Sequence, residues 1–169
     1  MLKIDSLNLN YPFVLAPMAG ITDLPFRMIC RRYGCELAFI EMTSAKALVY
    51  GNRKTEKMIA VRPEDRPLGI QLLGTDVEFI LRALDIIRKY EYEIIDFNAA
   101  CPVTKVTSKG EGSGLMKEPR KLGQLLKAPL SLGFQSPLTW LLLFALPNAL
   151  VAMASYGHSL TAFLQVAGW

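Results

Sequence analysis

Residues 94–106 have the sequence Ile94-Ile95-Asp96-Phe97-Asn98-Ala99-Ala100-Cys101-Pro102-Val103-Thr104-Lys105-Val106. The apolar start of this stretch is typical of a buried strand, and the proline after the cysteine stops a strand ladder because it has no N–H to donate. The strand therefore delivers an amide, from Asn98, and a thiol, from Cys101, to its carboxyl end. We expect any chemistry of the chain to take place there.

Strand-like and helix-like stretches alternate along the chain before this strand. Strands are predicted at residues 13–16, 37–42 and 68–73, after a short hairpin or edge strand at 2–10. Helices are predicted at residues 24–33, 44–50 and 77–87. This alternation indicates an α/β fold with a parallel sheet and right-handed crossovers.

Two of the predicted helices carry further signals. Asp23 is placed to cap the first, with Pro25 in its first turn, and its helical spacing brings together Phe26, Ile29, Cys30 and Tyr33. For the third, Thr75 and Glu78 have the spacing of a capping box. Its apolar face is predicted to contain Val77, Ile80, Leu81, Leu84 and Ile87.

The segment after the central strand is rich in glycine. Residues 109–114, Lys-Gly-Glu-Gly-Ser-Gly, predict a flexible loop. The loop that follows a strand is where a (β/α) barrel keeps its active site.

Two motifs together resemble the tRNA-dihydrouridine synthase family. One is Asn98-x-x-Cys101-Pro102-x-x-Lys105-Val106 with the glycine-rich loop behind it, and the other is Ala16-Pro17-Met18-Ala19-Gly20-Ile21-Thr22-Asp23-Leu24-Pro25-Phe26-Arg27. The resemblance covers about the first 127 residues. It implies the N-terminal half of a TIM (β/α)8 barrel, because 169 residues are too few for a complete barrel of ~250 residues.

The resemblance also implies an activity and its cofactors. In the family, reduced FMN gives a hydride to C6 of a uracil in tRNA, a cysteine protonates C5, and the product is 5,6-dihydrouridine; NADPH is the expected reductant of the flavin. Cys101 matches the family's cysteine, and a thiol of ordinary pKa is protonated at neutral pH. The structural alternative is a small buried thiol at the end of a strand.

Other site residues follow from the same resemblance. Pro17, Met18, Ala19 and Gln71 are expected to contact FMN, while Asn98 and Lys105 are expected to contact the substrate. The alternatives stay open: a loop-bracing role for Asn98, plain solvation for Lys105, and a hydrogen bond from Gln71 to a neighbouring strand.

The sequence also departs from the family pattern. Ala100 stands where many relatives have glycine, which is a mild change. The family's later lysine and histidine, its phosphate-binding turns and its helical RNA-binding domain have no matching positions here. We therefore expect impaired activity in this chain, and self-association through the open edge of the sheet.

Charge and cysteine content restrict the class of protein only loosely. The 19 Lys and Arg against 15 Asp and Glu give a net charge of +4, and the pI is about 9.0, which suits a nucleic-acid partner, although plain solubility charge is the commoner explanation. The 3 cysteines lack the spacing of a disulfide framework or a metal site. With no secretory signal recognised, we expect a cytoplasmic protein that binds no metal.

The composition changes abruptly after Lys127. Residues 128–169 contain no Asp, Glu, Lys or Arg. We therefore predict a partial TIM-barrel catalytic domain at 1–127 and an apolar tail at 128–169. The tail could be a membrane segment, although Pro147 and Asn148 interrupt it, or a packing segment for a partner subunit. We favour a shifted reading frame or an aberrant junction, and expect no membrane association.

Two other functions compete with the family's activity. The chain could be a non-catalytic fragment that associates through its open sheet edge or its apolar tail. It could instead be another FMN barrel reductase that acts on a free pyrimidine.

Overall fold

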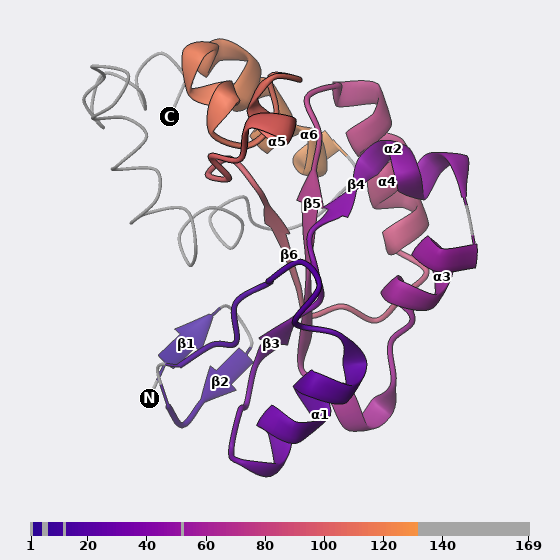
Figure 1. Ribbon diagram of the computed structural model, residues 1–169, viewed down its shortest axis with the longest axis vertical. Helices are drawn as coiled ribbons and strands as arrows, with labels where there is room; N and C mark the ends of the chain where they lie inside the picture. Colours follow the sequence, from indigo (N-terminus) through magenta and orange to yellow (C-terminus); the bar gives the residue numbers. More distant parts are fainter. Residues whose placement is uncertain (1, 5–6, 12, 52, 132–169) are drawn as a thin grey trace.

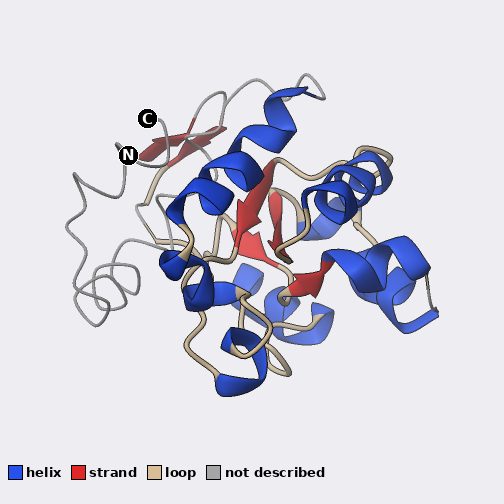
Figure 2. Ribbon diagram, turned by 90° about the horizontal axis from the view of Figure 1, so that it is seen from above, coloured by secondary structure: helices blue, strands red, loops and turns tan. Residues whose placement is uncertain are grey.

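The structure, a computed structural model, describes residues 2–4, 7–11, 13–51 and 53–131. It is a mixed α/β fold with a parallel sheet, in which helices lie around the strands (Figures 1 and 2). The chain begins with an antiparallel pair, β1 (Leu2–Ile4) and β2 (Leu7–Leu9), so the predicted hairpin is confirmed. The predicted tail beyond residue 131 lies outside the described residues.

The parallel sheet is built around β5 (Leu68–Leu73). Along one edge of β5 lie β3 (Ala38–Phe39), beside its start, and β4 (Thr43–Ser44), beside its end. Along the other edge lies β6 (Ile94–Phe97). The strands at 68–73 and 94–97 are thus confirmed as predicted.

The strand predicted at 37–42 is interrupted. The carbonyl group of Glu41 accepts a hydrogen bond from the Thr43 hydroxyl group at 3.0 Å instead of joining the ladder. The ladder resumes at β4, so β3 and β4 are two pieces of one broken strand beside β5.

The strand predicted at 13–16 is reduced to a single bridge. Leu15 pairs in parallel with Ala38: its N–H donates to the Leu37 carbonyl group at 2.9 Å, and its carbonyl group accepts from the Phe39 N–H at 3.1 Å. Phe13 is 77% exposed, so the prediction of a buried strand over four residues is wrong. Among the described residues this stretch has a pairing neighbour on one side only.

Helices connect the successive strands. The first, α1 (Leu24–Arg32), precedes β3, and both α2 (Ala45–Tyr50) and α3 (Arg53–Ile59) lie between β4 and β5. The short 3-10 helix η1 (Pro63–Asp65) leads into β5, and α4 (Val77–Ile87) connects β5 to β6. After β6 come α5 (Thr104–Thr107), the 3-10 helix η2 (Gly112–Lys117) and α6 (Pro119–Ser131). α3 is absent from the prediction.

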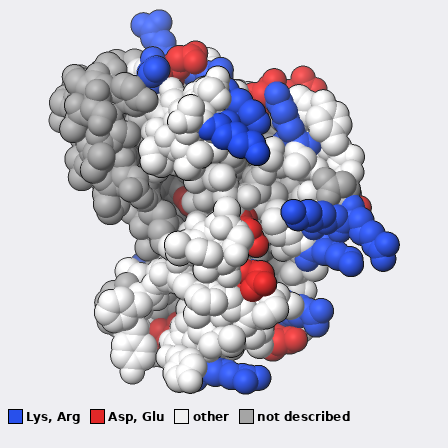
Figure 3. Space-filling model, viewed as in Figure 1, with Lys and Arg blue, Asp and Glu red and all other residues white. Residues whose placement is uncertain are grey.

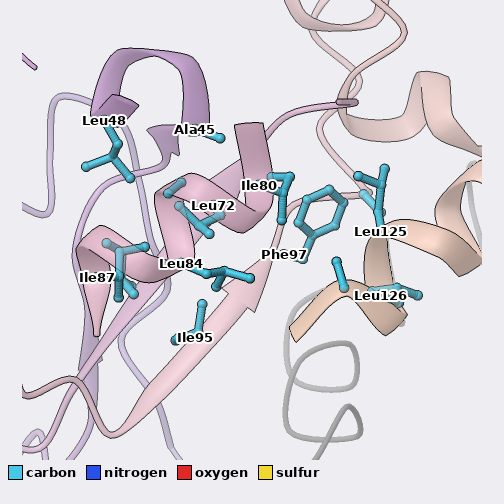
Figure 4. Packing of buried hydrophobic residues seen from close by; sticks show 14 of the residues in the cluster. Ala45, Leu48, Leu72, Ile80, Leu84, Ile87, Ile95, Phe97, Leu125 and Leu126 are labelled. Carbon is cyan, nitrogen blue, oxygen red and sulfur yellow. The ribbon is translucent and has the colours of Figure 1, made fainter. Parts of the chain in front are cut away.

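The core lies between the sheet and α4, with α6 closing one end. Ile80, Leu84 and Ile87 of α4 are buried as predicted, and the half-buried Val77 and Leu81 pack against them. In Figure 4, Phe97 of β6 points between α4 and Leu125 of α6. Burial of this apolar face is what stabilises α4 against the strands.

The N-cap of α4 differs from the prediction. The side chain of Asp76, not Thr75, accepts the free N–H groups of Glu78 and Phe79, at 2.9 and 3.3 Å. Aspartate is at least as strong a cap as threonine, and its charge also suits the positive end of a helix. The helix therefore begins one residue later than a capping box starting at Thr75 would place it.

In α1 the side turned to the core is polar. Asp23 caps this helix as predicted, but Tyr33 just beyond it is 89% exposed, and Phe26 and Ile29 are exposed as well. The buried residue of the helix is Arg27. An arginine that faces inward needs an acidic partner, which the helical spacing of apolar residues does not reveal.

That partner is Asp65 of η1. The Nη2 and Nε atoms of Arg27 lie 2.7 and 2.9 Å from Asp65 Oδ2, and Arg31 Nε lies 3.5 Å from Oδ1. Arg31 also donates to the carbonyl groups of Asp65 and Pro67, both at 2.6 Å. This buried ionic cluster fixes α1 to the segment that leads into β5.

Candidate active site

Polar side chains converge at the carboxyl ends of β5 and β6. Gln71 and Asp96 are directly opposite each other in the parallel register, and Gln71 Nε2 donates to Asp96 Oδ2 at 2.6 Å. Both side chains are buried. The carboxyl end of a parallel sheet is where α/β proteins place their ligands, so this pair lies where a ligand site is expected.

Asn98 continues this hydrogen-bonded chain. Its Nδ2 donates to Gln71 Oε1 at 2.9 Å, and its Oδ1 accepts from the backbone N–H groups of Cys101 at 2.9 Å and Ala100 at 3.2 Å. One amide thus joins the strand ends to the loop that carries the thiol. Because both ends of its side chain are engaged, Asn98 braces that loop.

A small cavity opens beside these residues. Its volume is about 190 Å³. It is lined by Ala16, Pro17, Gln71, Asp96, Phe97, Asn98, Ala99, Ala100, Cys101 and Pro102. The stretch after the first bridge, the end of β5 and the loop after β6 therefore meet around the half-buried Cys101 thiol.

The glycine-rich segment supports the loop from behind. Gly112, Ser113 and Gly114 are buried within η2, so this part of the predicted loop is a 3-10 helix. Ser113 N–H donates to the carbonyl group of Cys101 at 3.0 Å. Gly112 has φ +58°, and a Cβ atom there would lie 2.5 Å from the same carbonyl oxygen, so glycine is required for this close approach.

The acidity of Asp96 is strongly perturbed. Burial raises its pKa to about 6, and the hydrogen bond from Gln71 opposes that shift. Sequence reasoning did not select Asp96. The available signal was a carboxylate inside the apolar run Ile94-Ile95-Asp96-Phe97, where a charged side chain needs a function or a partner.

The predicted site residues divide into two groups. The structure brings together Pro17, Gln71, Asn98 and Cys101 around the cavity. Met18, Ala19 and Lys105 are outside the lining: Met18 is 49% exposed, Ala19 lies beside it on the surface, and Lys105 is exposed on α5. Their roles remain predictions.

The described part of the chain contains neither a cluster of metal ligands nor a helix that could span a membrane. Residues 2–131, apart from the few positions that are not placed, contain no group of three or more His, Cys, Asp or Glu side chains arranged to hold a metal ion. Within the same residues, no helix is long and apolar enough to cross a membrane.

Fold and site together define an α/β domain with a cluster of polar side chains beside a cavity at the carboxyl ends of its parallel strands, a common location for the active sites of enzymes. A family profile described as "Dihydrouridine synthase (Dus)" matches residues 14–133. The chain belongs to the dihydrouridine synthase family. The match extends six residues past the predicted boundary at 127, as far as the end of α6 and two residues beyond.

Curated relatives carry the same family name. The chain is 40% identical over 125 residues to tRNA-dihydrouridine synthase B of Pasteurella multocida (strain Pm70), which covers 74% of this chain and 38% of that protein. It is 40% identical over 125 residues to the probable tRNA-dihydrouridine synthase of Helicobacter pylori (strain ATCC 700392 / 26695), covering 73% and 38%. It is 35% identical over 127 residues to tRNA-dihydrouridine synthase B of Vibrio vulnificus (strain CMCP6), covering 75% and 39%. The chain therefore spans well under half the length of these relatives.

Proposed function

We propose that this chain is the N-terminal part of an oxidoreductase that reduces uridine to 5,6-dihydrouridine in tRNA. The observation that carries the proposal is the position of Cys101. Its thiol lines the cavity at the carboxyl end of β6, and its backbone is held from one side by Asn98 and from the other by Ser113. A proton donor needs this kind of fixed position beside an open space.

We propose that the described fold is the first half of a TIM barrel. In support, the stretch at Leu15, the broken strand β3 and β4, β5 and β6 lie side by side in chain order, all parallel, with helices between them. A barrel is built by adding strands in this way until the sheet closes, and it needs ~250 residues. The family match ends at residue 133, before a barrel of that size could close.

The cavity fits the ring of a flavin better than a whole flavin mononucleotide. Gln71 Nε2 has two hydrogens and donates to one described acceptor, Asp96, so a second N–H is left for a ring oxygen or nitrogen. Ala16 and Pro17 offer an apolar wall. However, the volume of about 190 Å³ is below the ~300 Å³ of a small ligand pocket.

A phosphate group finds no partner in this cavity. Among the residues lining it there is no Lys, Arg or His. We propose that Pro17 and Gln71 hold the flavin ring, that the phosphate is bound by a part of the barrel outside this chain, and that the activity of the chain alone is impaired for this reason. When bound, reduced FMN supplies the hydride for C6 of the uracil, and NADPH is the proposed source of that reducing power.

The proposed role of Cys101 is to supply the proton. The C5=C6 bond of uracil takes up one hydride at C6 and one proton at C5, and we assign the proton to the Sγ–H group of Cys101. Asn98 keeps this thiol at the mouth of the cavity. Since the amide of Asn98 is already engaged with Gln71 and the Cys101 loop, its contacts favour bracing over direct binding of the substrate.

The proposed nucleic-acid contacts are basic side chains outside the cavity. Lys105 and Lys109 are exposed beside the Cys101 loop. Figure 3 shows a further group of Lys and Arg side chains over α3, where Arg53, Lys54 and Lys57 are exposed. Such groups bind tRNA phosphates without reading the sequence.

A second candidate function is association as a non-catalytic fragment. The observation that favours it is the exposed apolar surface beside the open edge at Leu15, where Tyr11, Phe13 and Tyr33 line a shallow hollow together with Leu15. A large exposed apolar patch is a typical protein contact surface.

A single-turnover assay distinguishes the two functions. The purified 169-residue chain, FMN, NADPH and unmodified tRNA are incubated, and dihydrouridine is measured in the digested tRNA by mass spectrometry. We expect Cys101→Ala to lower the yield by roughly 10²-fold to 10⁴-fold, as loss of a general acid does, and Cys35→Ala to leave it unchanged. Equal yields from Cys101→Ala and the unmodified chain would contradict the proposed role of the thiol. Absence of product with all chains would favour the non-catalytic fragment.

A further inference from the structure

Asp96 is a buried acid to which the proposed reaction assigns no role. It lies in the middle of β6 between Ile95 and Phe97 and is 4% exposed. In the described part of the chain no Lys, Arg or His side chain forms an ion pair with it; its side-chain partner is the uncharged amide of Gln71. A buried carboxylate without a cation is costly, so its retention in the site calls for a specific explanation.

The ionised carboxylate imposes a direction on the hydrogen bonds that follow. A carboxylate only accepts, so Gln71 must turn its NH₂ group to Asp96 and its oxygen to Asn98. Asn98 must then turn its NH₂ group to Gln71, which leaves its oxygen for the N–H groups of Cys101 and Ala100. Every group in this chain of hydrogen bonds is matched in this one orientation.

Protonation of Asp96 removes that constraint. A protonated carboxyl group can donate to the oxygen of Gln71, and Gln71 can then turn its NH₂ group towards Asn98. If Asn98 turned in response, its NH₂ group would face the N–H groups of Cys101 and Ala100, donor against donor. Either the bond between Gln71 and Asn98 or the bonds to the Cys101 loop would then be lost.

We propose that Asp96 is a positioning residue, whose ionised carboxylate fixes the backbone at Cys101 through the amides of Gln71 and Asn98. One part of this proposal rests on the proposed function, namely that the fixed thiol serves as the proton donor. Burial raises the pKa of Asp96 to about 6, so the carboxylate is ionised at neutral pH and takes up a proton as the pH falls through about 6. We therefore expect the Cys101 loop to respond to pH in that range.

The surroundings of Asp96 contain little else that titrates. From β5 it faces Gln71, and from the stretch after Leu15 the cavity receives Ala16 and Pro17, all uncharged. Met42 contacts Asn98 through its sulfur at 3.2 Å. The other titratable group in the lining of the cavity is the thiol of Cys101 itself.

Nuclear magnetic resonance of the ¹⁵N-labelled 169-residue chain tests the proposal without flavin or tRNA. The backbone N–H signal of Cys101 and the side-chain NH₂ signals of Gln71 and Asn98 are followed from about pH 5 to about pH 8, a range that brackets the titration of a raised carboxyl group. We expect all three to shift together with a midpoint near pH 6. In Asp96→Asn the shifts disappear, whereas Asp85→Asn, on the exposed side of α4, leaves them unchanged.

A second variant covers the possibility that Asp96→Asn fails to fold. In Gln71→Met the carboxylate remains but the amide that transmits its charge is gone, so the Cys101 signal is expected to become insensitive to pH in this range. Retention of the full Cys101 shift in either variant would overturn the proposal, as would a Cys101 signal that does not titrate in the unmodified chain. These outcomes say nothing about dihydrouridine formation, so this proposal and the proposed function fail separately.

Discussion

Removing the carboxylate of Asp65 should destabilise the chain much more than removing an exposed carboxylate. Asp65 is 0% and Arg27 3% exposed, and their atoms approach to 2.7 Å, so Asp65→Ala leaves a buried guanidinium without its charged partner. Breaking a buried pair in this way costs about 3–5 kcal/mol in free energy of unfolding. Arg31, 10% exposed, loses a contact at the same time, which places the expected loss towards the upper end.

Urea denaturation followed by circular dichroism measures this loss. The matched control is Glu64→Ala, which removes the exposed carboxylate next in the chain within η1 and should change the free energy of unfolding by less than about 0.5 kcal/mol. The double variant Arg27→Met/Asp65→Leu should regain most of the stability, because apolar residues can replace a buried ion pair. A loss below about 1 kcal/mol for Asp65→Ala, typical of surface pairs, would refute the assignment of this cluster as the anchor of α1.

Two further predictions concern the site. The folded state raises the pKa of Asp96 from 3.8 to about 6, so it binds more protons than the unfolded state between these values, and the stability due to this group is greatest in acid and falls as the pH rises through 6. Relative to the unmodified chain, the free energy of unfolding of Asp96→Asn should therefore rise by about 3 kcal/mol between about pH 4 and about pH 8, which urea denaturation measures. A difference between the two chains that does not depend on pH would contradict this. Gly112→Ala should cost more stability than Gly110→Ala: both have positive φ, which costs ~1–3 kcal/mol in a non-glycine residue, but only the former also collides with the Cys101 carbonyl group. Equal losses of unfolding free energy would show that the close contact at Cys101 is unimportant.

Strong apolar patterning explains which elements the sequence predicts well. β5, β6 and α4 contribute much of the core, and their apolar residues are continuous along a strand or regularly spaced along a helix. α3 escapes prediction because its sequence, Arg-Lys-Thr-Glu-Lys-Met-Ile, offers little apolar face. Elements that bury much apolar surface are thus visible in the sequence, while short surface helices are not.

Contacts between residues that are distant in the sequence explain where the predictions from sequence fail. The outward face of α1 follows from the bond between Arg27 and Asp65, 38 residues apart, and the compact η2 follows from its contact with the Cys101 carbonyl group. Similarly, Cys101 and Asn98 were found from a motif and Gln71 from the family resemblance, whereas Asp96 becomes interpretable only when Gln71, 25 residues earlier, is seen opposite it. Local patterns cannot reveal pairings made by tertiary contact.

The central claim of the proposed function is that the described fold, which we propose to be the first half of a barrel, already provides the ring-binding wall of a flavin site. A titration of FMN with the 169-residue chain, followed by quenching of flavin fluorescence, tests it most directly. We predict saturable binding that Gln71→Leu weakens and that Lys105→Ala, exposed on α5 and outside the cavity, leaves unchanged; riboflavin should bind about as tightly as FMN because no cation lines the cavity. Quenching that does not saturate, or that Gln71→Leu does not alter, would contradict the account.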